Sequence, residues 1–234
     1  MRMDKVALYA RSDIGLVRTN NEDSYFTDVD RGLAIVADGM GGHAAGEVAS
    51  KMTVDTLSER VQVPNSFWPF GRTTRERDCI VGAIRLANQR VRHAAAQDTA
   101  LTGMGTTIVA LWIRGRRAHV AHVGDSRIYR YRKGGLVQLT RDHSWASEEA
   151  AMRNVLTRAI GAEDNVEVDH RVLDVAPGDV FLLCSDGLTR PVPDETIVSI
   201  LRESPNGDDA SGRLIDLAKQ KGAPDNVTVV LAYC

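Results

Sequence analysis

The sequence predicts an α+β fold built on antiparallel β-sheets. In the middle of the chain, short apolar runs follow one another directly and are joined by Arg-Gly-Arg at 114–116 and Lys-Gly-Gly at 133–135, which are typical hairpin connections. Runs of adjacent strands favour antiparallel sheets over the strand–helix alternation of parallel folds. No linker rich in Pro, Gly or Ser divides the sequence, so we expect one domain over 1–234.

The strands are predicted from short runs of β-branched and apolar residues. These runs lie at 6–10, 33–37, 106–113, 118–123, 128–131, 166–173, 180–184 and 227–233. A further strand is expected directly after Asp23. The helices are predicted where apolar residues recur at helical spacing, at 46–61, 75–96, 194–202 and 209–221. The segment 64–74 is expected to be the loop between the first two helices.

Composition excludes several classes of function. Lys and Arg total 29 against 31 Asp and Glu, so the formal net charge of −2 gives no global reason to bind nucleic acid or a membrane surface. The 43% hydrophobic content is typical of a folded globular protein. Cys79, Cys184 and Cys234 have spacings that fit neither a disulfide framework nor a zinc site. Together with the lack of a signal-like or membrane-spanning run, this predicts a cytoplasmic protein.

Aspartates recur at the ends of the predicted strands. Asp38, Asp125 and Asp186 each follow an apolar run, and Asp225 directly precedes the last one. One Asp-Gly is ordinary turn chemistry, but several carboxylates at one edge of a core repel one another unless a cation lies between them. Oxygen ligands without clustered His or Cys favour Mg²⁺ or Mn²⁺. Multinuclear sites of this kind typically act on phosphate esters.

Seven motifs occur in a fixed order over nearly the whole sequence. They are Ser-Asp-Ile-Gly-Leu-Val-Arg-Thr-Asn-Asn-Glu-Asp at 12–23, Ala-Asp-Gly-Met-Gly-Gly-His-Ala-Ala-Gly-Glu at 37–47, Gly-Thr-Thr at 105–107, Val-Gly-Asp-Ser-Arg at 123–127, Leu-Thr-Arg-Ala-Ile-Gly at 156–161, Ser-Asp-Gly at 185–187 and Asp-Asn-Val-Thr at 225–228. The chain resembles the bacterial metal-dependent Ser/Thr protein phosphatases of the PPM, or type 2C, family. The resemblance implies two packed antiparallel sheets flanked by helices, with the metal site at one end of the sandwich.

The resemblance also implies a reaction and a set of ligands. A water bridging two Mn²⁺ or Mg²⁺ ions attacks phosphoserine or phosphothreonine directly, without a phosphoenzyme. Asp38 would bridge the two ions. Asp186 and Asp225 would complete the first ion, the Gly39 carbonyl would bind the second, Asp125 would share a weaker third ion with Asp186, and Glu22 and Asp23 would hold metal-bound waters.

Arg18 matches the phosphate-binding arginine of the family. A planar guanidinium can bind two oxygens of a phosphomonoester at once. Two departures from the family pattern follow from the sequence. Met40 stands where eukaryotic relatives commonly have His, which leaves the proton donor open between a metal-bound water and His43. The segment 145–153 is shorter than the usual flap over the site, which predicts a more open site.

Two alternative functions fit the sequence less well. Cys184 and Arg190 fit the Cys-x5-Arg signature of cysteine-dependent phosphatases, but Asp186 would repel the substrate phosphate there, and a Cys that ends an apolar strand is typically a buried, inert thiol. The second alternative is a phosphoprotein-binding relative that has lost catalysis. Such relatives typically lack a metal aspartate, whereas this sequence has every expected one.

His119 and His122 lie at i and i+3 of one predicted strand, so they should face opposite sides and are not expected to share a zinc ion.

The resemblance implies phosphorylated Ser/Thr proteins as substrates, including a cognate Ser/Thr kinase. We expect a monomer that binds neither nucleic acid nor membrane.

Overall fold

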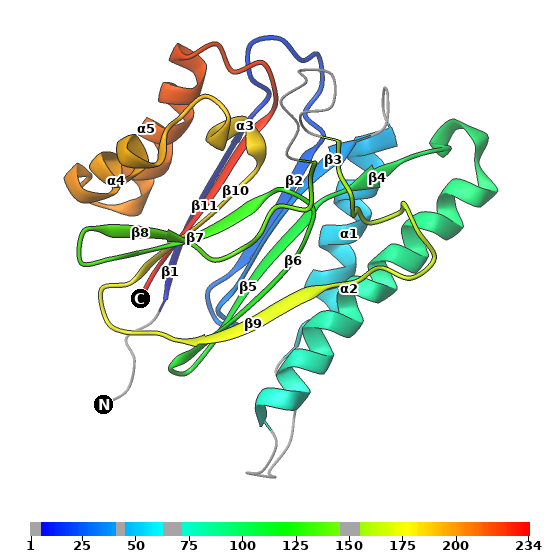
Figure 1. The fold of residues 1–234 in the computed structure, drawn as a ribbon, viewed down its shortest axis with the longest axis horizontal. Coiled ribbons are helices and arrows are strands. Elements are labelled where there is room, and N and C mark those ends of the chain that lie inside the picture. Colours follow the sequence, from blue (N-terminus) through cyan, green and yellow to red (C-terminus); the bar gives the residue numbers. More distant parts are fainter. Residues whose placement is uncertain (1–5, 41–44, 63–71, 146–154) are drawn as a thin grey trace.

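A computed structural model describes residues 6–40, 45–62, 72–145 and 155–234 of the chain. The described strands form two antiparallel sheets (Figure 1). The first sheet has the order β1 (Ala7–Asp13), β11 (Val227–Tyr233), β10 (Val180–Cys184), β7 (Arg127–Arg132) and β8 (Gly135–Gln138). The second has the order β2 (Asp23–Asp28), β3 (Leu33–Met40), β5 (Ile108–Arg114), β6 (Arg117–Val123) and β9 (Asp169–Asp174), with the short β4 (Gly105–Thr106) pairing with β3.

Helices cover the outer faces of the two sheets. The second sheet packs against α1 (Ala45–Arg60) and α2 (Arg72–Gln97), and the first against α4 (Asp194–Glu203) and α5 (Gly207–Gln220). The single turns α3 (Asp186–Thr189) and η1 (Thr99–Leu101) lie at connections. Among these helices, none combines the length and the apolar character needed to cross a bilayer. The expected sandwich of two antiparallel sheets between helices is therefore confirmed.

The core between the sheets is built from alternate residues of neighbouring strands. Val36 and Leu111 of the second sheet pack in one cluster with Phe181 and Val230 of the first. Phe181 is fully buried, and burial of a side chain of this size contributes about 1.5–3 kcal/mol to folding. The opposite faces of the same strands contact the helices, so the central strands are apolar on both faces and appear in the sequence as continuous apolar runs.

The predicted elements agree with the observed ones in the core and differ at the edges. The strands predicted at 180–184 and 227–233 are β10 and β11 with the same bounds. The strand predicted from residue 166 begins only at Asp169, and β8, with Leu136 and Val137 as its apolar residues, was not predicted. The hairpin turn that precedes β8 was predicted. Lys133 and Gly134 in this turn both have positive φ, as a two-residue type I′ turn requires.

The predicted metal residues lie at strand ends that meet at one end of the sandwich. Asp38 is near the end of β3, and Asp186 follows β10 and begins α3. The backbone N–H of Ser185 donates to the carbonyl of Thr228 at the start of β11 (3.2 Å), and that of Thr107 donates to the carbonyl of Asp38 (2.8 Å). Figure 1 shows the ends of β2 and β3 and the α3 turn at the same end of the molecule.

Candidate metal centre

Asp38 lies at the centre of the converging carboxylates. Its backbone is held in place: its N–H donates to Thr107 Oγ1 (3.0 Å), and Thr106 Oγ1 donates to its carbonyl oxygen (2.8 Å). Burial raises the pKa of Asp38 well above its usual range, and the charges of the other predicted aspartates raise it further. Those charges belong, in order of their effect, to Asp23, Asp186, Asp225 and Asp125. The structure therefore gathers the predicted metal aspartates around Asp38.

Asp23 lies opposite Asp38 across the β2–β3 pair. Ser185 Oγ donates to Asp23 Oδ2 (2.8 Å), while Asp23 Oδ1 is buried with no hydrogen-bond partner among the described residues. Burial, with smaller contributions from Asp225 and Glu22, raises the pKa of Asp23 to about 6. A buried carboxylate oxygen without a partner is costly, so this side chain fits a position beside a cation or an ordered water.

Asp186 is presented by the β10–α3 turn. Its Oδ1 is also buried without a partner in the described part of the chain, and its other oxygen pairs with Arg190. Burial raises the pKa of Asp186 to about 7 even though Arg190 acts in the opposite direction. A Cβ on Gly187 would lie 2.0 Å from the carbonyl oxygen of Asn226, so only glycine lets this turn pack against the loop that carries Asp225.

Gly39 is required by packing as well as by its predicted role. A Cβ at this position would lie 2.2 Å from the carbonyl oxygen of Gly46 and 2.6 Å from that of Glu22. The N–H of Gly39 donates to the Glu22 carbonyl (3.1 Å). Glycine thus lets the start of α1 approach the end of β3, and Glu22, which is 9% exposed, is held beside it.

Arg18 lies at the exposed mouth of the site, where it donates to Asp225 Oδ2 (2.9 Å). The side chain of Asn226 holds the loop that carries Arg18 through hydrogen bonds. No role was predicted for Asn226 from the sequence. The Asn226 amide donates to the carbonyls of Ile14 and Asn20 (2.9 Å each), and its Oδ1 accepts from the N–H of Glu22 (2.8 Å). Asn226 immediately follows Asp225, so one short segment supplies a predicted ligand and orients the phosphate-binding loop.

Arg190 and Cys184 do not form the alternative cysteine site. Cys184 is fully buried at the end of β10, and burial raises the pKa of its thiol. Arg190 instead pairs with Asp186 and lies 3.9 Å from Asp225. A buried, protonated thiol cannot act as the nucleophile. This role of Arg190 was not predicted, because the Cys-x5-Arg signature groups it with Cys184 rather than with Asp186, four positions earlier on the same turn.

Asp125 lies in the β6–β7 connection, 9% exposed, with its pKa raised chiefly by burial. The connection is held by His143. The backbone N–H of Gly124 donates to His143 Nδ1 (3.2 Å), and the backbone N–H of His143 donates to the Gly124 carbonyl (3.0 Å). The remaining candidates, His43 and all of the predicted flap except Trp145, lie outside the described residues.

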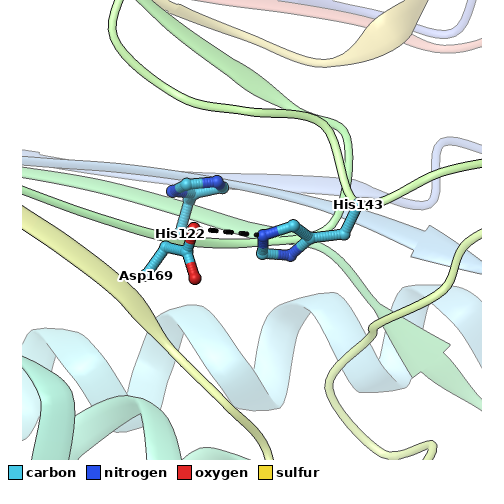
Figure 2. A group of neighbouring side chains, drawn as sticks. All are labelled: His122, His143 and Asp169. Carbon is cyan, nitrogen blue, oxygen red and sulfur yellow. Dashed lines mark ion pairs between the residues drawn. The ribbon is translucent and has the colours of Figure 1, made fainter.

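A second group of side chains was not predicted as a unit. Figure 2 shows His122, His143 and Asp169. One ring nitrogen of each histidine and one carboxylate oxygen of Asp169 lie within 4.8 Å of one another. The two rings stack at 4.7 Å between centroids, and His143 Nε2 lies 3.5 Å from Asp169 Oδ2. The three residues are distant in the sequence, so periodicity could not bring them together. As predicted, His119 lies on the other face of β6, where its Nε2 contacts Glu76 of α2 (3.0 Å).

The hydrogen bonds of this group favour a hydrogen-bonded cluster of side chains over a metal site. Because His143 Nδ1 accepts from Gly124, the neutral ring carries its proton on Nε2, which faces Asp169. Arg158 donates to Asp169 Oδ1 (2.9 Å), so the carboxylate already has a cationic partner. Burial lowers the pKa of both His122 and His143, which keeps the rings neutral.

Comparison with known proteins places this arrangement in a family. The family model described as Protein phosphatase 2C matches residues 17–219. The chain is 40% identical over 236 residues to the serine/threonine protein phosphatase PstP of Mycobacterium tuberculosis, and the match covers 95% of this chain and 44% of PstP. It is 38% identical over 238 residues to the serine/threonine phosphatase stp of Listeria welshimeri, covering 94% and 93% of the two chains.

Solved structures agree with the sequence relatives. The chain superposes with a TM-score of 0.84 on the catalytic domain of PstP in complex with two manganese ions, at 39% identity and 98% coverage of each chain. It superposes with a TM-score of 0.88 on PppA, a regulatory component of the type VI secretion system in Pseudomonas aeruginosa, at 35% identity and the same coverage. The gathered aspartates, the sandwich and these matches together show that the chain belongs to the protein phosphatase 2C family.

Proposed function

We propose that the chain is a metal-dependent phosphatase that hydrolyses phosphoserine and phosphothreonine in proteins. The observation that carries this proposal is the convergence of Asp23, Asp125, Asp186 and Asp225 on Asp38, with buried carboxylate oxygens that lack partners among the described residues. Such a set of acids needs divalent cations to compensate its charge. The two manganese ions of the PstP catalytic domain and the names of the relatives support the same assignment.

The proposed ligand roles follow the sequence assignments. Asp38, Asp186, Asp225 and the Gly39 carbonyl would hold two Mn²⁺ or Mg²⁺ ions. Asp125 and Asp186 would hold a weaker third ion, and Glu22 and Asp23 would hold the water molecules around the ions. When bound, the ions neutralise phosphoryl oxygens and activate the water that attacks phosphorus.

Arg18 is proposed to orient the substrate phosphate. Its guanidinium is half exposed and already close to the carboxylates, where it donates to Asp225. Once the charge of Asp225 is compensated by a cation, the same guanidinium is available for two phosphoryl oxygens. Arg190 is proposed to limit the repulsion between Asp186 and Asp225 before the cations bind.

The proton for the leaving Ser or Thr alkoxide is proposed to come from a water molecule. Met40, at the position directly after Asp38-Gly39, carries no transferable proton. The alkoxide is a poor leaving group, so a nearby proton source speeds its departure. Replacement of Met40 by His tests this point: a side-chain donor there should change the alkaline side of the pH–rate profile.

We further propose that the substrates are phosphorylated Ser/Thr proteins, including a cognate Ser/Thr kinase, in cytoplasmic signalling, and that the chain acts as a monomer. The chain spans about half the length of the M. tuberculosis relatives it matches. Comparison of phosphoproteins in cells with and without the gene would identify the substrates.

The test of the activity is hydrolysis of p-nitrophenyl phosphate and of a phosphothreonine peptide with added Mn²⁺. Asp38→Asn should lower kcat by about a thousandfold, because loss of a bridging carboxylate removes several kcal/mol of transition-state stabilisation. Arg18→Ala should raise KM and lower kcat/KM. Asp216→Asn, at an exposed position on α5, is the matched control and should leave the rate unchanged. Inactivity of the natural chain with every divalent ion would overturn the proposal.

A further inference from the structure

A basic cavity lies at the edge strand of the second sheet, apart from the aspartates. Its volume is about 440 Å³. The residues that give it its chemical character are Arg77, Arg141, Arg171, His122, His170 and Asp169. Among the described strands, β9 pairs with β6 on one side only, so the cavity borders an open sheet edge. A cavity of this size can hold a charged side chain together with the backbone around it.

The cavity concentrates positive charge in a chain whose formal net charge is −2. Among the described residues that line it, three are arginines and one is an aspartate. That aspartate, Asp169, already pairs with Arg158 (2.9 Å). The arginine charge is therefore not compensated within the lining, and an anion is the ligand that the cavity attracts.

Part of the lining is fixed. Arg171 donates to the carbonyl of Leu139 (3.1 Å). His170 Nε2 lies 3.3 Å from His119 Nδ1, and His119 Nε2 lies 3.0 Å from Glu76 Oε2. Because His119 donates to Glu76, its Nδ1 accepts from His170 Nε2, so the neutral His170 ring is held in one orientation.

Two arginines are available for a ligand. Arg77 and Arg141 are exposed, and neither guanidinium has a hydrogen-bond or ion-pair partner in the part of the chain that the structure describes. Arg77 and His170 line the same cavity, and burial, with the charges of His119 and Arg77, lowers the pKa of His170 to about 4. Unpaired guanidinium groups beside a fixed wall form a site that can bind phosphate oxygens in pairs.

The shape and position of the cavity favour a phosphate carried by a polypeptide. Its remaining side chains include the aliphatic Val120, Leu139 and Val168, with no Phe, Tyr or Trp among the described lining residues to stack on a nucleobase. An extended peptide can lie along the open edge of β9 through backbone hydrogen bonds. His122 lines the cavity, and Asp125 belongs to the candidate metal centre. The two residues are three positions apart along β6 and the loop after it, a span of about 10 Å, so one peptide could reach both the cavity and the metal centre.

We propose that this cavity binds a second phosphorylated side chain of the protein substrate while the first lies at the metal centre. This inference rests on the proposed phosphatase function. It makes doubly phosphorylated segments, with phosphates a few residues apart, better substrates than singly phosphorylated ones. Arg77 and Arg141 supply the contacts to the second phosphate, and Arg171 and His170 shape the wall.

The test compares peptides that carry two phosphothreonines, two to six residues apart, with peptides in which the second is plain threonine. The substrates are given to the natural chain, to Arg77→Ala, to Arg141→Ala and to the double variant. The double variant should lose about tenfold or more in kcat/KM on the doubly phosphorylated peptide, as expected for lost charged hydrogen bonds. It should change less than about twofold on the singly phosphorylated peptide and on p-nitrophenyl phosphate.

Arg116→Ala is the matched control, because Arg116 is an exposed arginine in the turn before β6 and does not line the cavity. It should leave both peptides unaffected. Equal rates for the two peptides in the natural chain, or equal losses on both in the double variant, would overturn the proposal. Binding of inorganic phosphate to the cavity, followed by NMR of the His170 ring, with no preference for the doubly phosphorylated peptide would assign the cavity to free phosphate and would also overturn it.

A direct binding measurement separates this inference from the proposed function. If the natural chain does not hydrolyse p-nitrophenyl phosphate, the phosphatase proposal fails. Titration calorimetry with the doubly phosphorylated peptide still tests the cavity, because affinity that falls in the Arg77→Ala, Arg141→Ala double variant supports it. Affinity that does not change between the variants contradicts it.

Discussion

Asp23 and Asp38 are directly paired across β2 and β3, and the charge of Asp23 is the largest of the neighbouring charges that raise the pKa of Asp38. A cross-strand pair of like charges is destabilising in a sheet of ordinary function. Here it lies at the end of the sandwich, where Asp186, Asp225 and Asp125 add further negative charge. The fold thus holds acids in an arrangement that opposes its own stability, as is expected of a site prepared for cations.

The carboxyls of Asp23 and Asp186 should destabilise the metal-free protein as pH rises through the acidic range. In the folded chain they have pKa values of about 6 and about 7. Their unfolded values are about 4, so each binds more protons in the folded state, and its contribution to stability is lost as pH rises from about 4 to 7. His122, His143 and His170, whose pKa values are lowered, act in the opposite direction over the same range, so the informative quantity is the difference between the natural chain and the Asp23→Asn, Asp186→Asn double variant. In urea unfolding with chelator, the double variant should gain several kcal/mol relative to the natural chain between these pH values. A difference that does not grow with pH would contradict the raised pKa values.

Asn226 should matter more than its lack of charge suggests. Asn226→Ala removes an amide that donates to Ile14 and Asn20 and accepts from Glu22, in a side chain that is 4% exposed. We expect a loss of about 3 kcal/mol in stability, because buried backbone groups lose their partners, and a higher KM for phosphopeptides as the Arg18 loop loosens. Urea unfolding and steady-state kinetics measure both. Gln220→Ala, at an exposed position, is the control, and equal behaviour of the two variants would disprove the role of Asn226.

Two glycines should respond in opposite directions to alanine. Gly187→Ala puts a Cβ 2.0 Å from the Asn226 carbonyl, so we expect destabilisation by about 2–4 kcal/mol and weaker Mn²⁺ binding. Gly82 lies within α2, where a Cβ would meet no atom of the described residues within 4 Å, so Gly82→Ala should stabilise the chain by about 0.5–1 kcal/mol. Thermal unfolding with and without Mn²⁺ distinguishes them. A tolerated Gly187→Ala would show that the turn has room the structure does not indicate.

Cys184 should be dispensable for catalysis. Its thiol is fully buried among core residues, so Cys184→Ala should keep kcat for p-nitrophenyl phosphate within about twofold while lowering stability by about 1 kcal/mol. Chelator should abolish the activity of the natural chain. The reverse pattern, with activity lost in Cys184→Ala and retained in chelator, would restore the cysteine mechanism.

The sequence predicts the strands that are buried on both faces best, because their apolar runs have no competing interpretation. β10 and β11 match their predicted bounds, whereas β8 and the start of β9 do not, since edge strands carry few apolar residues. The aspartates were predicted because each lies at the end of such a run. The roles of Asn226 and Arg190, and the grouping of His122 with His143 and Asp169, depend on loops meeting in space, which periodicity does not encode.

The central claim is that Asp38 and its neighbours bind divalent cations, and calorimetric titration with Mn²⁺ tests it most directly. The natural chain should bind two ions tightly and a third weakly. Asp38→Asn should lose the tight pair, Asp125→Asn should lose only the weak ion, and Asp216→Asn should bind like the natural chain. Unchanged Mn²⁺ binding in Asp38→Asn would contradict the account.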